Sequence, residues 1–137
     1  MTAKILVVDN EPDLVELLNV TLTRHGHHIF SASTGLDALH QARRHLPDLI
    51  LLDLMLDDLD GFSVCEVLRS QPSTRGTPVI IMSALAGEMA RLKSYHAGAV
   101  DFLGKPFRLQ EVVGRVAALL QAQAERLAAA PAADPAA

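Results

Sequence analysis

Polar side chains suited to metal and proton chemistry stand directly after short apolar runs of the sequence. They are Asp9, Asn10 and Glu11, then Asp53, then Ser83, and finally Lys105. A carboxylate that emerges from a buried segment needs partners. Two carboxylates a few ångström apart repel each other by about 4 kcal/mol at an effective dielectric constant near 20. Lys105 can offset part of that repulsion, and a divalent cation can offset the rest.

The donor atoms of these side chains indicate which cation to expect. Carboxylates, a backbone carbonyl and water are hard oxygen ligands, which suit Mg²⁺ or Mn²⁺ better than zinc. A cation, an ammonium group and a hydroxyl around one carboxylate can neutralise a transferring phosphoryl group from several sides. The residue types therefore predict a site of phosphoryl transfer centred on Asp53.

The apolar runs that precede these residues have the pattern of buried strands. Four of them, residues 5–8, 49–52, 79–82 and 100–103, do not alternate regularly with polar residues, and Asp101 is the one polar residue among them. This is typical of strands buried on both faces of a parallel sheet. A weaker run, residues 28–31, is flanked by polar residues and predicts an edge strand.

Helical patterns separate the strands. Apolar residues recur at helical spacing within residues 14–22, 36–46, 62–68, 89–95 and 109–120. Pro12 suits a first helical turn, Gly26 and Gly98 suit helix ends, and Pro47 and Pro78 precede strands. The alternation predicts an α/β fold, a (βα)5 open parallel sheet. Ligands bind at the carboxyl ends of such strands, so the polar residues above should meet on one rim.

Composition restricts the class of protein. The 137 residues suit one domain, and half of them are hydrophobic, so the chain should fold. With a net charge of -4 and only three lysines, no direct nucleic-acid binding is expected. The longest apolar runs are far shorter than the roughly 20 residues of a membrane helix, and no signal-peptide pattern is evident. We therefore expect a cytoplasmic protein without a membrane segment.

Residues 1–121 should form this domain. Residues 122–137 should continue the last helix and then become a disordered tail rich in Ala and Pro. The single cysteine, Cys65, stands among apolar residues and is expected to be buried.

From Lys4 to Leu120 the sequence resembles the receiver domain of two-component response regulators, in particular the chemotaxis receiver. Four motifs carry the resemblance: residues 5–12 (ILVVDNEP), 53–61 (DLMLDDLDG), 82–84 (MSA) and 101–107 (DFLGKPF). The resemblance implies a flavodoxin-like strand order of 2-1-3-4-5. It further implies a signalling phosphoacceptor in a phosphorelay, which is not an enzyme beyond assisting its own phosphorylation and dephosphorylation.

The resemblance also implies roles for individual residues. Asp53 would accept a phosphoryl group from a histidine kinase or a histidine phosphotransfer protein. Mg²⁺ would be held by Asp9, Asn10, Asp53 and the backbone carbonyl of Met55. Lys105 would pair with the phosphate and Ser83 would hydrogen-bond it. Phe102 matches the switch aromatic, and Pro106 matches a proline that follows a cis peptide bond.

The output implied by the resemblance is a change in one face of the domain. This face consists of the fourth helix, the fifth strand and the fifth helix, and carries Arg91, Asp101, Arg108 and Arg115. It would bind a second copy of the chain or a downstream output protein.

Two positions depart from the family's usual pattern. Asn10 replaces a second acid, and Asp57 replaces a proline four residues past the acceptor. Either Glu11 or Asp57 restores the missing negative charge, or Mg²⁺ binds weakly and the domain is only partly phosphorylated. A second possible function is therefore that of an adaptor of the same fold that works without phosphorylation.

Two further classes of protein fit the sequence less well. An aspartyl-phosphate phosphohydrolase generally needs a second acid two residues after its nucleophile, and here that residue is Met55. A flavodoxin-like cofactor protein is disfavoured because the acidic loop after Val8 would repel a phosphate.

Several conspicuous residues have simpler interpretations. His25, His27 and His28 are not expected to bind a metal ion, because no two lie on one helical face. Asp57, Asp58 and Asp60 are expected to form a solvated loop, with Asp60 capping the next helix. Arg43 and Arg44 should face solvent.

Overall fold

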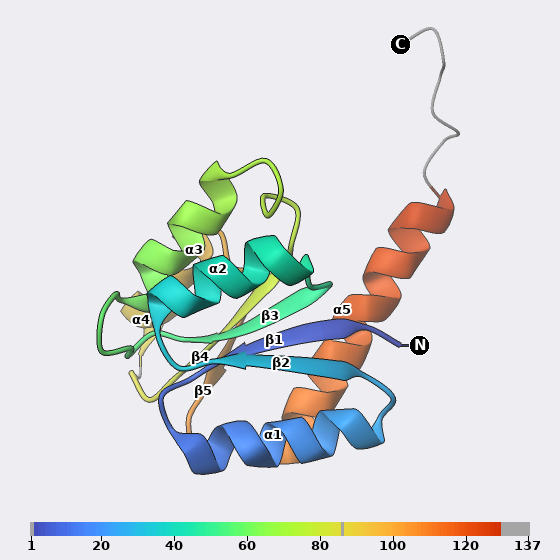
Figure 1. The fold of residues 1–137 in the computed structure, drawn as a ribbon, viewed down its shortest axis with the longest axis horizontal. Helices are drawn as coiled ribbons and strands as arrows, with labels where there is room; N and C mark the ends of the chain where they lie inside the picture. Colours follow the sequence, from blue (N-terminus) through green and yellow to red (C-terminus); the bar gives the residue numbers. More distant parts are fainter. Residues whose placement is uncertain (1, 86, 130–137) are drawn as a thin grey trace, which may run out of the picture.

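The computed structural model describes residues 2–85 and 87–129. Strands and helices alternate along this part of the chain (Figure 1). The elements are β1 (Lys4–Val8), α1 (Pro12–Arg24), β2 (His28–Ala32), α2 (Gly35–His45), β3 (Leu49–Asp53), α3 (Gly61–Ser70), β4 (Val79–Ser83), α4 (Glu88–His96), β5 (Asp101–Gly104) and α5 (Leu109–Ala129).

The strands form one parallel sheet in the order β2-β1-β3-β4-β5, which confirms the expected fold. The crossover between β2 and β3 passes over β1, so the chain reverses its direction across the sheet between β1 and β3. Asp9 directly follows β1 and Asp53 ends β3, so both lie at this reversal point, where ligands of such sheets bind.

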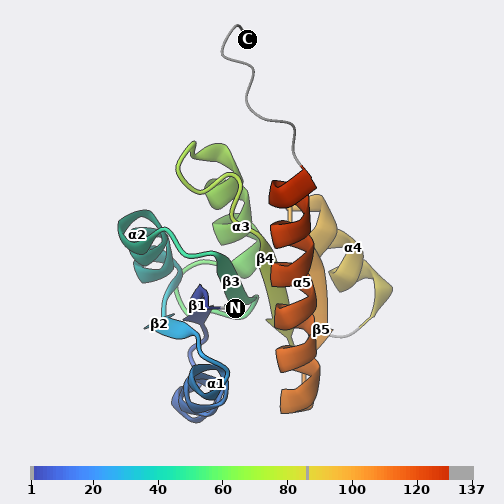
Figure 2. The same ribbon diagram turned by 90° about the vertical axis from the view of Figure 1, so that its right-hand side faces the viewer.

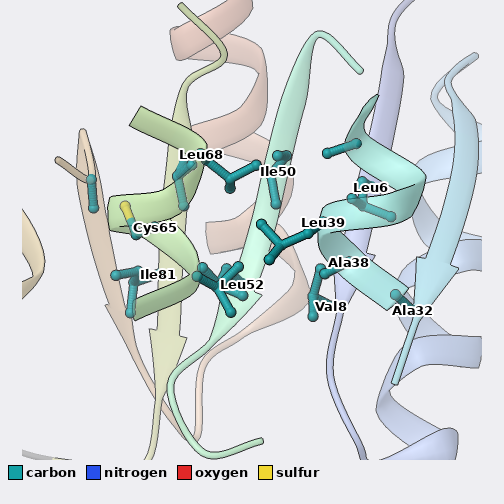
Figure 3. Close-up of a cluster of buried hydrophobic side chains, with 14 of the residues drawn as sticks. Leu6, Val8, Ala32, Ala38, Leu39, Ile50, Leu52, Cys65, Leu68 and Ile81 are labelled. Atoms are coloured by element: carbon teal, nitrogen blue, oxygen red, sulfur yellow. The ribbon is translucent and has the colours of Figure 1, made fainter. Parts of the chain in front are cut away.

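Each central strand is buried on both faces because helices cover both. Alternate residues point to opposite sides: Leu6 and Val8 pack with α2 and α3, whereas Ile5 and Val7 pack with α1 and α5. Figure 3 shows the first cluster, in which Leu39 of α2 and Cys65 of α3 lie over β1, β3 and β4. This double burial explains the apolar runs without alternation.

One strand prediction is wrong in part. The sequence predicts that residues 100–103 are buried on both faces, but β5 lies at an edge of the sheet, like β2. Only Leu103 is fully buried there, while Asp101 and Phe102 are half-buried and Val100, just before the strand, is 46% exposed. Helices that cover the centre of a sheet need not extend over its edges, so the faces of an edge strand can stay partly exposed.

The predicted helix ends are confirmed. Pro12 is the first residue of α1, and Gly26 and Gly98 follow α1 and α4 with positive φ angles of 90° and 109°. A side chain at Gly98 would be strained by the backbone and would also meet Arg69, with a Cβ atom 2.6 Å from its Nε. Asp60 caps α3 by accepting a hydrogen bond from the Ser63 N–H at 2.9 Å.

Helix α5 is the longest described helix, and Figure 2 shows it along its whole length. It continues through residues 122–129, as expected; the predicted tail at 130–137 lies outside the described residues.

Cys65 is buried, and burial raises the pKa of its thiol. Arg43 and Arg44 are exposed. Across residues 2–85 and 87–129, no helix combines the length and apolar character needed to span a membrane.

Candidate functional site

The carboxyl ends of four strands bring the predicted site residues to one rim. Asp9 follows β1, Asp53 ends β3, Ser83 ends β4 and Lys105 follows β5. Asp9, Asp53 and Ser83 are each no more than 3% exposed. Polar groups buried to this extent require bonded partners, and the neighbouring strand ends supply them.

Lys105 connects three carboxylates. Its Nζ atom lies 2.8 Å from Oδ2 of Asp9, 3.1 Å from Oε1 of Glu11 and 3.4 Å from Oδ2 of Asp53. Its backbone N–H donates to the carbonyl of Ser83 at 2.7 Å, which ties the loop after β5 to the end of β4. The peptide bond between Lys105 and Pro106 is cis, the geometry that the resemblance implied.

The carboxylates of Asp9, Glu11 and Asp53 form a cluster that suits a hard cation. One oxygen of each lies within 4.8 Å of the others. In the described part of the chain this is the one group of three or more such side chains that could hold a metal ion, and the histidines near residue 27 form none. The donor set of three carboxylates fits Mg²⁺ or Mn²⁺.

The charges in this cluster shift two pKa values. Burial, with repulsion from Asp9 adding to it, raises the pKa of Asp53, although the Met55 N–H and Lys105 act against the shift. Burial alone would lower the pKa of Lys105, but its hydrogen bonds to Asp9 and Glu11 outweigh burial and raise it. The raised pKa of Lys105 favours its ammonium form, and the raised pKa of Asp53 reflects a negative charge that its partners only partly balance.

The backbone after Asp53 also contributes to the site. The Met55 N–H donates to Oδ1 of Asp53 at 3.2 Å, and Met55 is 54% exposed. On the neighbouring strand, the Ser83 hydroxyl oxygen accepts a hydrogen bond from the Leu85 N–H at 3.0 Å. This contact leaves the hydroxyl proton of Ser83 free to donate elsewhere.

A cavity of about 530 Å³ opens above these groups. Its lining includes Glu11, Asp53, Met55, Ala84 and Lys105. A small group can therefore reach Asp53 and Lys105 from solvent. Phe102 is half-buried against the cluster of α2 and α3 and lies in β5, one strand beyond Ser83.

Asn10 and Asp57, the two residues that depart from the family's usual pattern, contact each other. Nδ2 of Asn10 donates to Oδ1 of Asp57 at 3.4 Å. Asn10 thus directs its amide nitrogen toward the loop after β3, and Glu11 supplies the third carboxylate of the cluster.

The acidic loop after β3 is exposed at Asp57, Asp58 and Asp60, as the sequence predicts. One of these side chains also has a contact that the sequence does not indicate: the two oxygens of Asp58 accept the N–H groups of Gly35 at 2.7 Å and Leu36 at 3.0 Å, in the first turn of α2. These two hydrogen bonds lower the pKa of Asp58, Leu36 contributing most. No local pattern could reveal this contact, because its partners lie 23 and 22 residues away.

Comparison with known families agrees with this geometry. The family model of the response regulator receiver domain matches residues 5–117. The chain belongs to this family. As a receiver domain it is a signalling domain of two-component systems. Receiver domains bind Mg²⁺ at an acidic pocket, and this chain has an acidic cluster of Asp9, Glu11 and Asp53.

Individual relatives support the same assignment. The receiver domain is 43% identical over 119 residues to the response regulator PleD of Caulobacter vibrioides, covering 87% of this chain and 26% of PleD. It is 42% identical over 121 residues to the alkaline phosphatase synthesis transcriptional regulatory protein PhoP of Bacillus subtilis, covering 88% of this chain and 50% of PhoP. The chain therefore spans between a quarter and a half of the length of these relatives.

A solved structure matches the fold closely. The receiver domain of the Francisella response regulator 1452 superposes with a TM-score of 0.83 at 31% sequence identity, covering 88% of this chain and 98% of that chain.

Proposed function

We propose that this receiver domain accepts a phosphoryl group on Asp53 from the phosphohistidine of a histidine kinase or a histidine phosphotransfer protein. In this step the P–N bond to the imidazole breaks, a P–O bond to the Asp53 carboxylate forms, and the released imidazole takes up a proton. The observation that carries the proposal is the buried Asp53 carboxylate with Lys105 3.4 Å away, beneath a cavity open to solvent.

A divalent cation fits the site next to Asp53. Asp9, Asp53 and the backbone carbonyl of Met55 are the proposed ligands, joined by Asn10 or Glu11. When bound, Mg²⁺ or Mn²⁺ would neutralise negative charge that develops on the phosphoryl oxygens. The cluster of Asp9, Glu11 and Asp53 supports Glu11 as a ligand. The contact of Asn10 with Asp57 supports a role for Asn10 in joining the loop after β1 to the loop after β3.

Other side chains complete the site. Lys105 already binds the carboxylate of Asp53 and would pair with an oxygen of the phosphoryl group once it is attached. Ser83 has a free hydroxyl proton to donate to a second oxygen. Movement of Ser83 toward the phosphoryl group would give Phe102, which lies on the neighbouring strand β5, room to turn inward.

The proposed output surface is the face formed by α4, β5 and α5. Asp101 and Arg115 form an ion pair at 2.6 Å on this face, directly beside Phe102. A change at Phe102 would therefore reach charged side chains that a second copy or an output protein can bind. PhoP is a transcriptional regulator, but with its net charge of -4 this chain is proposed to act through such a partner, without touching nucleic acid.

A second candidate function is an adaptor of the same fold that works without phosphorylation. The observation that favours it is the contact between Asn10 and Asp57, because it replaces a charged metal ligand by an amide turned toward another residue.

Incubation with acetyl phosphate or phosphoramidate and Mg²⁺, followed by mass spectrometry, distinguishes the two functions. A phosphoacceptor gains the mass of one phosphoryl group, and Asp53→Asn gains none. Gain of the same mass by Asp53→Asn would contradict the assignment of Asp53. No gain by the unmodified chain would favour the adaptor.

A further inference from the structure

The loop between β3 and α3 is a closed structure that carries part of the site. At its base the Gly61 N–H donates to the Leu54 carbonyl at 2.9 Å, and Met55 forms an antiparallel bridge with Asp60. Met55 also donates its N–H to Asp53. The position of the loop therefore determines where the Met55 backbone lies relative to the Asp53 carboxylate.

The tip of this loop is attached to α2. Asp58 accepts the N–H groups of both Gly35 and Leu36, which begin the helix and have no partner within it. Leu59 packs on the same turn so closely that a Cβ atom at Gly35 would lie 2.9 Å from the Cβ atom of Leu59. One carboxylate with two bonds and one apolar contact thus fix the tip in position and orientation.

We propose that Asp58 is a positioning residue: by binding the first turn of α2 it holds the Met55 backbone against Asp53. This inference rests on the proposed function in one respect, which is that the Met55 carbonyl faces the cation and its N–H faces the phosphoacceptor. Loss of the attachment at Asp58 leaves the loop tip held only by the packing of Leu59 and by the long hydrogen bond of 3.4 Å from Asn10 to Asp57, and Met55 then samples other positions.

The competing explanation is that Asp58 only stabilises α2 as a helix cap. The chain offers a matched control, because α2 has a second side-chain cap. Oγ1 of Thr34 accepts the Asp37 N–H at 3.1 Å, and this contact does not involve the loop after β3. Thr34→Ala therefore removes a cap from the same helix end and leaves the loop attachment intact.

The experiment compares Asp58→Ala, Asp58→Asn and Thr34→Ala with the unmodified chain. Amide hydrogen exchange at Met55 reports the loop position without any phosphoryl donor. Titration with Mg²⁺ measures the affinity of the site for the cation, and the rate of phosphorylation by acetyl phosphate measures its reactivity. Asp58→Ala should speed exchange at Met55 and weaken Mg²⁺ binding, each by about threefold to tenfold, the range expected when a pair of cap hydrogen bonds is lost.

Asp58→Asn should fall between Asp58→Ala and the unmodified chain, because its one carbonyl oxygen can still accept one of the two N–H groups. Thr34→Ala should lower the melting temperature as Asp58→Ala does, with Met55 exchange and Mg²⁺ binding unchanged. Equal effects of Asp58→Ala and Thr34→Ala on Met55 exchange would overturn the inference. If the unmodified chain takes no phosphoryl group, the proposed function fails, while the exchange at Met55 still decides whether Asp58 positions the loop.

Discussion

Asn10 and Asp57 are joined by a hydrogen bond, and their identities depend on each other. The amide of Asn10 can donate to the carboxylate of Asp57, whereas a carboxylate at position 10 could not. A carboxylate there would also add a negative charge next to Asp9, Glu11 and Asp53, which already share the single ammonium group of Lys105. The amide of Asn10 therefore limits the repulsion among the carboxylates of the site when no divalent cation is bound.

Asn10→Asp should therefore destabilise the protein in chelator. We expect its free energy of unfolding to fall by about 1 to 2 kcal/mol, because a hydrogen bond is replaced by repulsion between like charges. Millimolar Mg²⁺ should restore or exceed the original stability, since a cation that binds only the folded state adds stability by mass action. Thermal melting curves with chelator and with Mg²⁺ measure both effects.

The control is the double variant Asn10→Asp with Asp57→Asn, which recreates one amide facing one carboxylate. It should recover most of the stability lost in chelator. An unchanged melting temperature of Asn10→Asp in chelator would mean that Asn10 does not interact with the acidic residues of the site.

At the scale of elements, β1 and β2 are joined near their N-terminal ends by His27. The Ala3 N–H donates to Nδ1 of His27 at 3.2 Å, and the His28 N–H donates to the Ala3 carbonyl at 2.8 Å. Nδ1 can accept this bond only when it carries no proton. Burial, together with repulsion from His25, lowers the pKa of His27.

The lowered pKa determines the direction in which the stability of the protein changes with pH. The unfolded chain binds a proton at His27 more readily than the folded chain does, so the contribution of His27 to stability is present above about pH 6.5 and is lost as the pH falls below that value. We expect a loss of about 0.5 kcal/mol between pH 7 and pH 5, a small figure because the half-buried ring remains partly hydrated. Chemical denaturation at a series of pH values measures it.

His27→Gln should reduce this pH dependence, because glutamine does not titrate. The neighbouring His28 is exposed, and His28→Gln provides a matched variant for comparison. Equal slopes for the unmodified chain and His27→Gln would show that His27 does not contribute.

At the scale of the whole molecule, the face of α4, β5 and α5 combines apolar and charged groups. Met89 and Leu92 of α4 are 65% and 53% exposed, and Arg91 lies over the ring of Tyr95 at 5.8 Å. The edge strand β5 adds Asp101, paired with Arg115. Apolar side chains rimmed by charges are typical of surfaces that bind other proteins.

We expect phosphorylation to promote association through this face. Light scattering with a phosphoryl mimic and saturating Mg²⁺ should give twice the mass of a single chain, and Asp53→Asn should remain at the single-chain mass. Leu92→Glu should weaken this association by about tenfold or more, because it places a charge in the centre of the apolar contact. Val20→Glu, at a similarly exposed position on α1, is the control and should not weaken it. An unchanged mass with the mimic bound would contradict the prediction.

The sequence by itself determined the fold class, the strands and the residues at their carboxyl ends. Hydrophobic periodicity indicates where strands and helices lie along the chain, and this pattern is local to each segment. Asp9, Asp53, Ser83 and Lys105 could therefore be assigned to one rim, because the carboxyl ends of parallel strands meet there whatever the details of packing.

Only the tertiary structure decided how the polar groups pair. Asn10 bonds to Asp57, 47 residues away; Asp58 bonds to Gly35, 23 residues away; and Glu11 joins Lys105, 94 residues away. The edge position of β5 likewise depends on the order of strands in the sheet. Hydrogen bonds and ion pairs require particular distances and directions between side chains, and the packing of helices against the sheet sets these, whereas the spacing of residues along the chain does not.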